Sequence, residues 1–171
     1  RTPAQRVQNV RLAIQKDRQP DKLVERGKLF AQIGDDNRAA QYFSAALDNG
    51  ASEKQVLPLL LQTYIASRRY RVAIDVAKQY LQKDPNDYRL RFLVGTLYAA
   101  IGDTVQAQAD FEQVLVTDPR HAQAQYALAV LLRDVDNDWV KADYHFRQYL
   151  KLAPRGPHAE EARASLLKRV P

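Results

Sequence analysis

Apolar and small residues recur at three- and four-residue spacings along most of the chain, and short polar breaks interrupt them. This spacing is typical of amphipathic α-helices, whereas half-buried strands would alternate with a period of two. Breaks that separate two helical stretches fall at residues 34–35, 67–69, 102–103 and 134–138. The pattern predicts an all-α chain built from successive helix-turn-helix units.

One phrase of the sequence occurs twice, as GKLFAQIGD at residues 27–35 and as GTLYAAIGD at 95–103, which indicates an internal repeat. In steps of 34 residues, with one residue inserted late in the last copy, four columns align. We interpret the small residues as points of close helix approach, and the aromatic ones as fillers between helix pairs. The columns are Gly27, Leu61, Gly95 and Ala129; Phe30, Tyr64, Tyr98 and Leu132; Ala39, Ala73, Ala107 and Ala142; and Phe43, Ala77, Phe111 and Phe146.

Three of the four copies end in a proline, at Pro85, Pro119 and Pro154. We expect each proline to stop one helix pair and to suit the first turn of the next helix, where its missing N–H is not needed. Residues 52–55 are expected to form a capping box for the helix that follows.

This pattern resembles the tetratricopeptide repeat family, whose 34-residue unit has small, aromatic and proline positions in the same order. The resemblance covers residues 20–154 and implies a right-handed α-solenoid of helix-turn-helix repeats with flanking helices. Leu61, Ala77 and the extra residue of the fourth copy depart from the pattern and put local packing angles in question. The implied repeats span residues 20–53, 54–87, 88–121 and 122–155.

The flanking segments are expected to be helical as well. Residues 1–19 are interpreted as an N-terminal helix, a degenerate half-repeat, with Val7, Val10 and Ile14 on one face. Residues 156–171 are interpreted as a C-terminal cap that contains one amphipathic helix over 157–168. In that helix we expect Ala159, Ala162, Leu166 and Leu167 to face the last repeat, and Glu160, Glu161, Arg163 and Lys168 to face water.

Composition narrows the class of protein. The chain has no cysteine, which excludes disulfides, thiolate catalysis and cysteine-based zinc sites. Its longest apolar run, residues 56–61, is too short to span a bilayer. Because the sequence starts with Arg1 and has no methionine, we expect a processed product or a fragment. Its location stays open between the cytoplasm and a bacterial periplasm or outer-membrane-associated site.

The net charge of +6 raises the question of an anionic partner. The excess lies at the chain ends, +4 over residues 1–18 and +2 over 155–171, while the middle is neutral. A nucleic-acid binder needs cations clustered on one face, so nucleic-acid binding is disfavoured.

No motif for catalysis or metal binding stands out. The three histidines lie far apart and are interpreted as surface residues, and there is no phosphate loop or nucleophile elbow. Residues 134–138, DVDND, imitate the start of an EF-hand loop, but Trp139 stands where the loop needs glycine and His145 where it needs glutamate. We interpret this segment as a turn in which Asn137 or Asp138 caps the next helix, and Trp139 as a packing aromatic. The chain is expected to be no enzyme and to hold no cofactor or metal.

The family resemblance implies a concave groove lined by the first helix of each repeat. The family's carboxylate clamp is absent, because Val24, Lys28, Leu59, Arg89 and Leu93 stand at its five positions. We therefore expect a non-catalytic scaffold that binds an apolar partner segment in this groove, within a multiprotein assembly. The alternative is a self-assembling module whose groove captures a neighbour's N-terminal helix through Val7, Val10 and Ile14. The candidate groove residues are Val24, Lys28, Gln55, Pro58, Leu59, Gln62, Ile65, Arg89, Phe92, Leu93, Thr96, Gln123, Tyr126, Val130 and Arg133.

Overall fold

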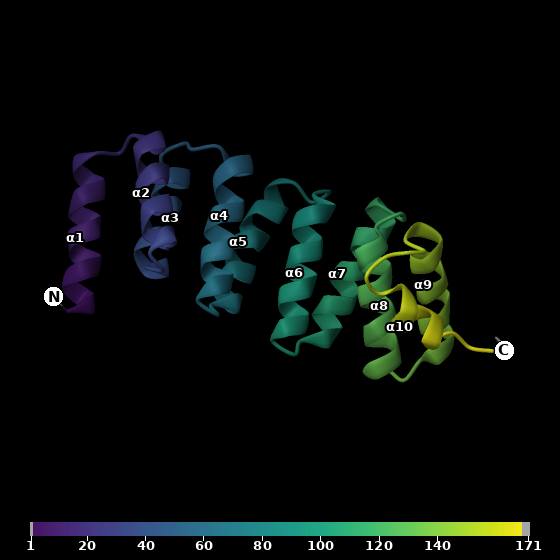
Figure 1. Ribbon diagram of the computed structural model, residues 1–171. Helices are drawn as coiled ribbons and strands as arrows, with labels where there is room; N and C mark the ends of the chain where they lie inside the picture. The colour runs from purple at the N-terminus through teal and green to yellow at the C-terminus, as the bar shows by residue number, and fades with distance from the viewer. Residues whose placement is uncertain (1, 169–171) are drawn as a thin grey trace. The chain divides into compact units, whose positions relative to one another are not determined.

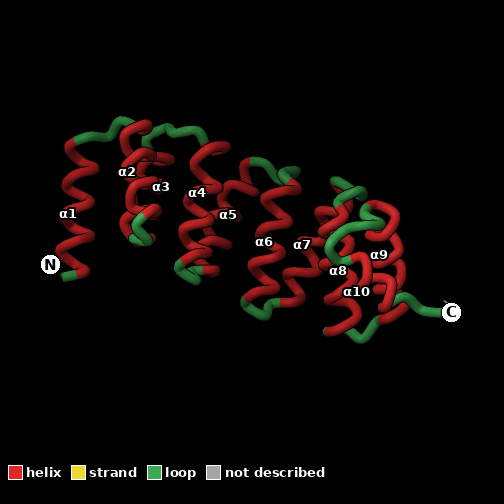
Figure 2. Tube along the Cα trace, viewed as in Figure 1, coloured by secondary structure: helices red, strands yellow, loops and turns green. Residues whose placement is uncertain are grey.

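A computed structural model describes residues 2–168, so residue 1 and residues 169–171 of the two predicted flanking segments lie outside the description. The described residues form α-helices joined by short connections, without a strand (Figures 1 and 2). The all-α class expected from the spacing is confirmed. The helices are α1 Pro3–Lys16, α2 Pro20–Gln32, α3 Asp36–Asp48, α4 Glu53–Ala66, α5 Tyr70–Lys83, α6 Tyr88–Ala100, α7 Thr104–Thr117, α8 Ala122–Asp134, α9 Trp139–Leu152 and α10 Ala159–Ala164.

The chain divides into two compact units, unit 1 over residues 1–76 and unit 2 over residues 77–171. The boundary falls within α5, so unit 1 holds α1 to α4 and unit 2 holds α6 to α10. Within the units, α2 packs against α3, α6 against α7 and α8 against α9. None of the described helices is long and apolar enough to cross a membrane.

Each helix pair turns through one residue with a positive φ angle. In the turn from α2 to α3, Gly34 takes this conformation and the N–H of Asp35 donates to the carbonyl of Phe30 at 2.9 Å, as in a Schellman motif. Glycine adopts this backbone region without steric cost, which explains the glycine near the end of the repeated phrase, and the aspartate after it is the N-cap of the next helix. The equivalent residues are Gly34, Arg68, Gly102 and Asn137, with φ values of 76°, 58°, 82° and 55°.

The small residues of the first column allow a close contact between paired helices. A Cβ placed on Gly27 would lie 2.6 Å from Cε1 of Phe43, and one placed on Gly95 would lie 2.8 Å from Cε1 of Phe111. Both phenylalanines are almost fully buried. The predicted role of the column, to let the second helix approach the first, is confirmed at these two positions.

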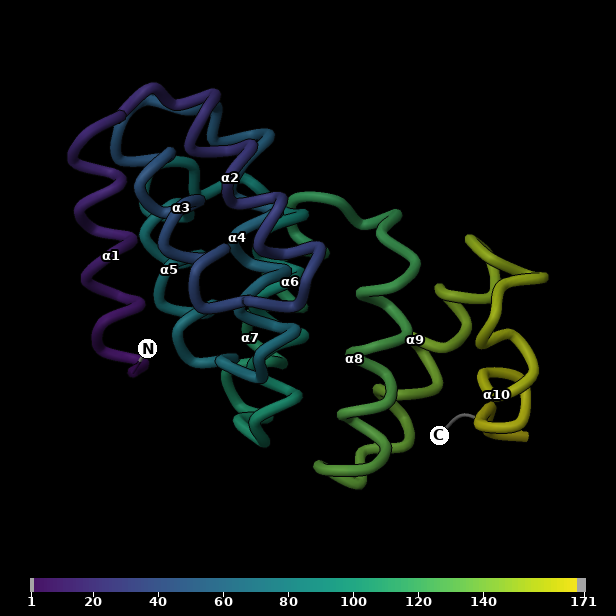
Figure 3. Tube along the Cα trace, turned by 60° about the vertical axis from the view of Figure 1, so that its left-hand side comes forward, coloured from purple at the N-terminus to yellow at the C-terminus, as the bar shows by residue number. Residues whose placement is uncertain are grey.

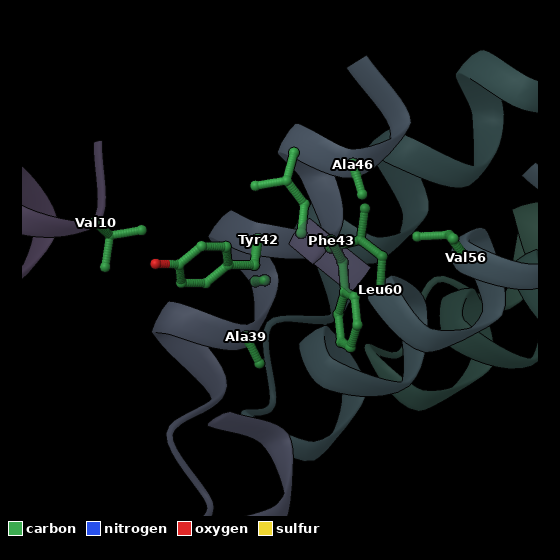
Figure 4. Packing of buried hydrophobic residues seen from close by; sticks show 9 residues of the cluster. Val10, Ala39, Tyr42, Phe43, Ala46, Val56 and Leu60 are labelled. Atoms are coloured by element: carbon green, nitrogen blue, oxygen red, sulfur yellow. The ribbon is translucent and has the colours of Figure 1, made fainter. Parts of the chain in front are cut away.

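The core of unit 1 joins α1 to the first repeats. Figure 4 shows Tyr42 of α3 pointing toward Val10 of α1, with Phe43 directed toward the neighbouring helices. In the turned view of Figure 3, α1 runs beside α3, in agreement with the contacts between these helices. Phe30 stacks on Tyr42 with ring centroids 5.5 Å apart. The buried cluster comprises Val10, Leu23, Ala39, Ala40, Tyr42, Phe43, Ala46, Val56 and Leu60.

The prolines that close the repeats do not lie in the first turn of a helix, so that expectation was wrong. Pro85 follows Asp84 in a turn whose ends are joined by the N–H of Asp87 and the carbonyl of Asp84 at 3.2 Å. Pro119 occupies the equivalent turn before α8. The fixed φ of proline favours the second position of such turns, and the aspartate before it bonds the turn backbone through its side chain.

The capping box predicted at residues 52–55 is also absent from the described structure. Ser52 is the N-cap of α4, but its side chain accepts no capping hydrogen bond. Its carbonyl instead accepts the N–H of Gln55 at 3.2 Å, which closes the first turn through the backbone. A complete capping box occurs at α1, where Thr2 and Gln5 exchange bonds of 2.9 and 3.2 Å.

The C-terminal helix is shorter than the predicted span of 157–168. α10 ends at Ala164, with Ser165 as its C-cap. Beyond it, the N–H of Leu167 donates to Oδ1 of Asp143 at 2.8 Å instead of to a helix carbonyl. Asp143 is buried and also accepts a hydrogen bond from Nε of Arg147 at 2.8 Å. Its carboxylate thus replaces a helix carbonyl as the acceptor for Leu167, and the chain leaves the helical path before this residue.

Candidate functional site

The predicted groove residues of unit 1 lie on α2 and α4, and none of them is buried. Lys28 is exposed and pairs with Glu25 at 3.1 Å. Val24 and Leu59 are half-buried and pack against the unit 1 core. The remaining predicted residues of unit 1 lie on α4, where Ile65 is half-buried and Gln55, Pro58 and Gln62 are exposed.

The predicted residues of α6, in unit 2, have a similar character. Phe92 and Leu93 are half-buried, while Arg89 and Thr96 are exposed. The ring of Phe92 lies 5.5 Å from that of Phe111 and 4.7 Å from that of His121. One side of the Phe92 ring therefore belongs to the packing of unit 2. We call the predicted residues of α2, α4, α6 and α8 the first-helix face, considered separately in each unit.

The part of this face on α8 contacts the chain's own C-terminal segment. Tyr126 stacks on His158 with ring centroids 3.9 Å apart, and its hydroxyl donates to Oε2 of Glu161 at 2.5 Å. Arg133 donates to Oε1 of Glu161 at 3.1 Å and to Oγ of Ser165 at 2.6 Å. Gln123 is exposed and Val130 half-buried on the same helix.

These contacts shift the acid-base properties of the groups involved. Burial, and then the hydrogen bond to Glu161, raise the pKa of Tyr126 to about 12. The hydrogen bond from Tyr126 lowers the pKa of Glu161; burial opposes this effect, and Arg133 adds to it. Glu161 does not simply face water, as its place on the predicted amphipathic helix had suggested. Its carboxylate joins the C-terminal segment to α8 through Tyr126 and Arg133.

Sequence reasoning missed the contribution of His158, Glu161 and Ser165 to this site. Tyr126 and Glu161 are 35 residues apart, with no periodic relation that marks them as neighbours. The only signal was the expectation that the C-terminal segment covers the last repeat. Ala159 and Ala162 are indeed buried, and α10 packs on α9.

The three histidines are half-buried instead of lying freely on the surface, which corrects the sequence interpretation. His121 caps α8, accepting the N–H of Ala124 at Nδ1 over 3.0 Å, and burial lowers its pKa. His145 is hydrogen-bonded to Gln125 at 2.7 Å, and burial lowers its pKa too. They lie in different parts of unit 2, and among residues 2–168 no group of metal-ligating side chains comes together.

The acidic turn at residues 134–138 serves as a helix connection. Asp138 caps α9 by accepting the N–H of Lys141 at 3.1 Å, as predicted. Trp139 does not fill the core; it is 42% exposed and its Nε1 donates to Asn137 at 3.0 Å. Trp139 is the first residue of α9, directly after the turn that contains the extra residue of this copy.

The face of α1 that the self-assembly hypothesis requires is largely occupied within the chain. Val10 is 5% exposed and belongs to the core that contains Tyr42. Ile14 packs against the same core, and of the three residues only Val7 is exposed. A neighbouring molecule could take this face only if α1 first left α3.

Tandem helix pairs with buried small and aromatic columns and positive-φ turns define an α-solenoid repeat protein. Residues 64–131 match the tetratricopeptide repeat family model. A tetratricopeptide repeat protein from Parabacteroides merdae has a TM-score of 0.74 at 19% identity over 85% of this chain and 58% of its own. YrrB, described as a TPR protein with an unusual peptide-binding site, gives 0.66 at 22% identity over 81% and 71%.

MamA from Desulfovibrio magneticus, from residue 41 to its end, has a TM-score of 0.67 at 18% identity over 91% of this chain and 88% of its own. No curated protein matches the sequence significantly. The chain spans less than two thirds of the Parabacteroides protein. Together these findings confirm the α-solenoid fold and the resemblance to the tetratricopeptide repeat family.

Proposed function

We propose that this chain is a non-catalytic scaffold that binds a segment of another protein on its first-helix face, within a multiprotein assembly. The observation that carries the proposal is the contrast in burial between two sets of residues on the same helices. The residues of the small column on α2, α4, α6 and α8 are buried, whereas the apolar residues of the first-helix face keep part of their surface in water. Exposed apolar surface that is rimmed by polar groups is typical of a protein-binding site.

The contacts that α8 makes within unit 2 indicate which chemistry a partner segment needs. Within unit 2, Tyr126 and Arg133 hold a short helical segment through one carboxylate, that of Glu161, and one aromatic stack. The same face of α6 presents Phe92 and Leu93 with Arg89 beside them. A partner segment with apolar anchors and an acidic residue would match this chemistry. The peptide-binding site of YrrB is consistent with such a role.

The first test locates the bound partner on the chain. Photoreactive residues placed at Gln62 of α4 and Thr96 of α6, both exposed, should crosslink to a partner in a native lysate. Matched positions on the second helices are Gln79 of α5 and Gln113 of α7, which are also exposed. We expect crosslinks from the first pair and few from the second.

The second test measures affinity for the partner so identified. Gln62→Glu with Thr96→Glu adds charge to the first-helix face without touching the core, and should weaken binding about tenfold through desolvation of the carboxylates. Gln79→Glu with Gln113→Glu is the control and should leave the affinity unchanged. Equal crosslinking from both helix faces, or equal affinity of the two double variants, would contradict the proposal.

A further inference from the structure

A second surface in unit 1 lies away from the first-helix face, in a cleft between α1 and α3. Two adjoining cavities of about 510 and 450 Å³ share Asn37, Gln41 and Arg69 in their lining. Arg6 of α1 lines the first cavity and Arg11 of α1 lines the second. We call these two cavities together the α1–α3 cleft.

Four arginines and two aspartates line the α1–α3 cleft, so its charge is positive on balance; Asp35 lines the first cavity and Asp48 the second. Asp35 is held by Arg38 at 2.6 Å. Burial acts to raise the pKa of Asp35, but the hydrogen bonds from Arg38 lower it, and the net shift is downward. This carboxylate therefore stays ionised and paired with Arg38. Among the described residues, Arg6, Arg11 and Arg69 form no ion pair with a carboxylate, although the charge of Arg6 also lowers the pKa of Asp35. Arg69 is oriented by stacking over the ring of Tyr64 at 4.9 Å.

The cleft also contains an acceptor that lacks a donor. Oε1 of Gln41 is buried and has no hydrogen-bond partner in the described structure. A buried acceptor of this kind costs free energy unless a ligand satisfies it. Phosphate and carboxylate groups accept hydrogen bonds at neutral pH, whereas a peptide backbone supplies an N–H. The unsatisfied oxygen therefore favours a peptide over a simple anion.

The spacing of the amides indicates the conformation of that peptide. Asn37 and Gln41 are one turn apart on α3, which separates them by about 6 Å along the helix axis. Alternate residues of an extended chain are separated by about 6.6 Å, a close match. A helical ligand would already use its backbone N–H groups internally.

We propose that the α1–α3 cleft binds an extended, acidic segment of another protein, with backbone bonds to Gln41 and Asn37 and carboxylates near Arg6, Arg11 and Arg69. This site goes beyond the first-helix face and does not depend on it. The residues of α1 act here as one wall of the cleft, which assigns a role to the basic N-terminal helix. The positive charge of α1 therefore acts within the cleft, through Arg6 and Arg11.

The test uses a fluorescent peptide of alternating glutamate and valine, capped at both ends, and fluorescence anisotropy at low and physiological salt. The wild-type chain should bind this peptide, and should bind the version with glutamine in place of glutamate at least about tenfold more weakly. Arg11→Gln with Arg69→Gln should cause a similar loss. Lys16→Gln with Lys54→Gln removes the same charge from exposed positions outside the cleft and should change the affinity less than about twofold.

A separate variant, Gln41→Leu, tests the backbone contact. Because Gln41 Oε1 has no partner to lose, the variant should keep or raise the melting temperature while it weakens peptide binding about fivefold. If Arg11→Gln with Arg69→Gln lowers helicity, Arg69→Gln alone replaces it. Gln62→Glu with Thr96→Glu should still bind the peptide, so failure of this proposal is distinct from failure of the first.

Three results would overturn the inference. The first is no binding of the acidic peptide by the wild-type chain, or equal binding of the glutamine version. The second is equal affinity of the cleft and control variants for the acidic peptide. The third is tighter binding of a thymidine decanucleotide or of phosphatidylserine vesicles than of the peptide, with the same dependence on Arg11 and Arg69.

Discussion

Placing a large residue at position 95 and a small one at position 111 tests whether the close approach of paired helices depends on a small residue facing a large one. An added Cβ at Gly95 would lie 2.8 Å from Cε1 of Phe111 and 3.2 Å from Cβ of Asp110, both closer than ordinary contacts. The second copy carries the reverse order of sizes, with Leu61 in the small column and Ala77 in the aromatic one. The double variant Gly95→Leu with Phe111→Ala copies that order into the third repeat.

The expected magnitudes follow from these contacts. Gly95→Leu alone should destabilise the fold by about 1–3 kcal/mol through overpacking, partly offset by about 0.8 kcal/mol of helix propensity. Phe111 is 2% exposed, so Phe111→Ala alone should cost about 3–5 kcal/mol through the cavity it leaves. In the double variant the leucine fills part of that cavity. Its cost should be about 2 kcal/mol smaller than the sum of the single costs, within the range seen for residues in contact.

Urea unfolding followed by circular dichroism measures all four proteins of this cycle, with the slope of the transition as a check on cooperative unfolding. Gly95→Ala serves as a milder variant, in which the gain in helix propensity and the close contact nearly cancel. Additive free energies in the cycle would refute the reasoning. So would an unchanged stability of Gly95→Leu, since Phe111 would then have room to move aside at no cost.

Two further predictions concern the turn of the second repeat and the C-terminal cap. Arg68 adopts a φ of 58°, so Arg68→Gly should raise the free energy of unfolding by about 1 kcal/mol, whereas Arg68→Ala, which keeps the Cβ, should not; thermal unfolding distinguishes them. Glu161 has a lowered pKa in the folded chain, so its contribution to stability is present above the usual glutamate pKa and is lost as the pH falls through the folded value. The melting temperatures of wild type and Glu161→Gln should therefore differ at pH 7 and converge in acid, and a constant difference across this range would contradict the role of the carboxylate.

Much of the fold could be predicted because each repeat is encoded locally. Gly27 and Phe43 lie 16 residues apart, and Gly95 and Phe111 are spaced in the same way, so the contact recurs with the period of the sequence. The breaks at residues 34–35 and 102–103 were also predicted, but the positive φ angles of Gly34 and Gly102 were not. Arg68 could not be recognised as a left-handed turn residue, because the backbone of its repeat imposes a conformation that its residue type does not favour.

The candidate site could be predicted less completely. Helical periodicity and the family resemblance predicted the first-helix residues as a binding face, and the structure leaves each of them half-buried or exposed. They did not show that Tyr126 and Arg133 are engaged by Glu161, because hydrogen bonds between remote side chains leave no periodic trace in the sequence. They also did not place Gln41 in a cleft, because its burial depends on how α1 lies against α3.

The amino-acid sequence by itself thus determined the helical class, the repeat length and the close approach of paired helices at Gly27 and Gly95, since these follow from spacing and size within one copy. Only the tertiary structure decided where α10 ends, which groups hold the cap, and which basic residues face the α1–α3 cleft. The physical reason is that these features arise from side-chain contacts between distant segments. Asp143 illustrates this, because its buried carboxylate needs a donor and takes it from Leu167, 24 residues away.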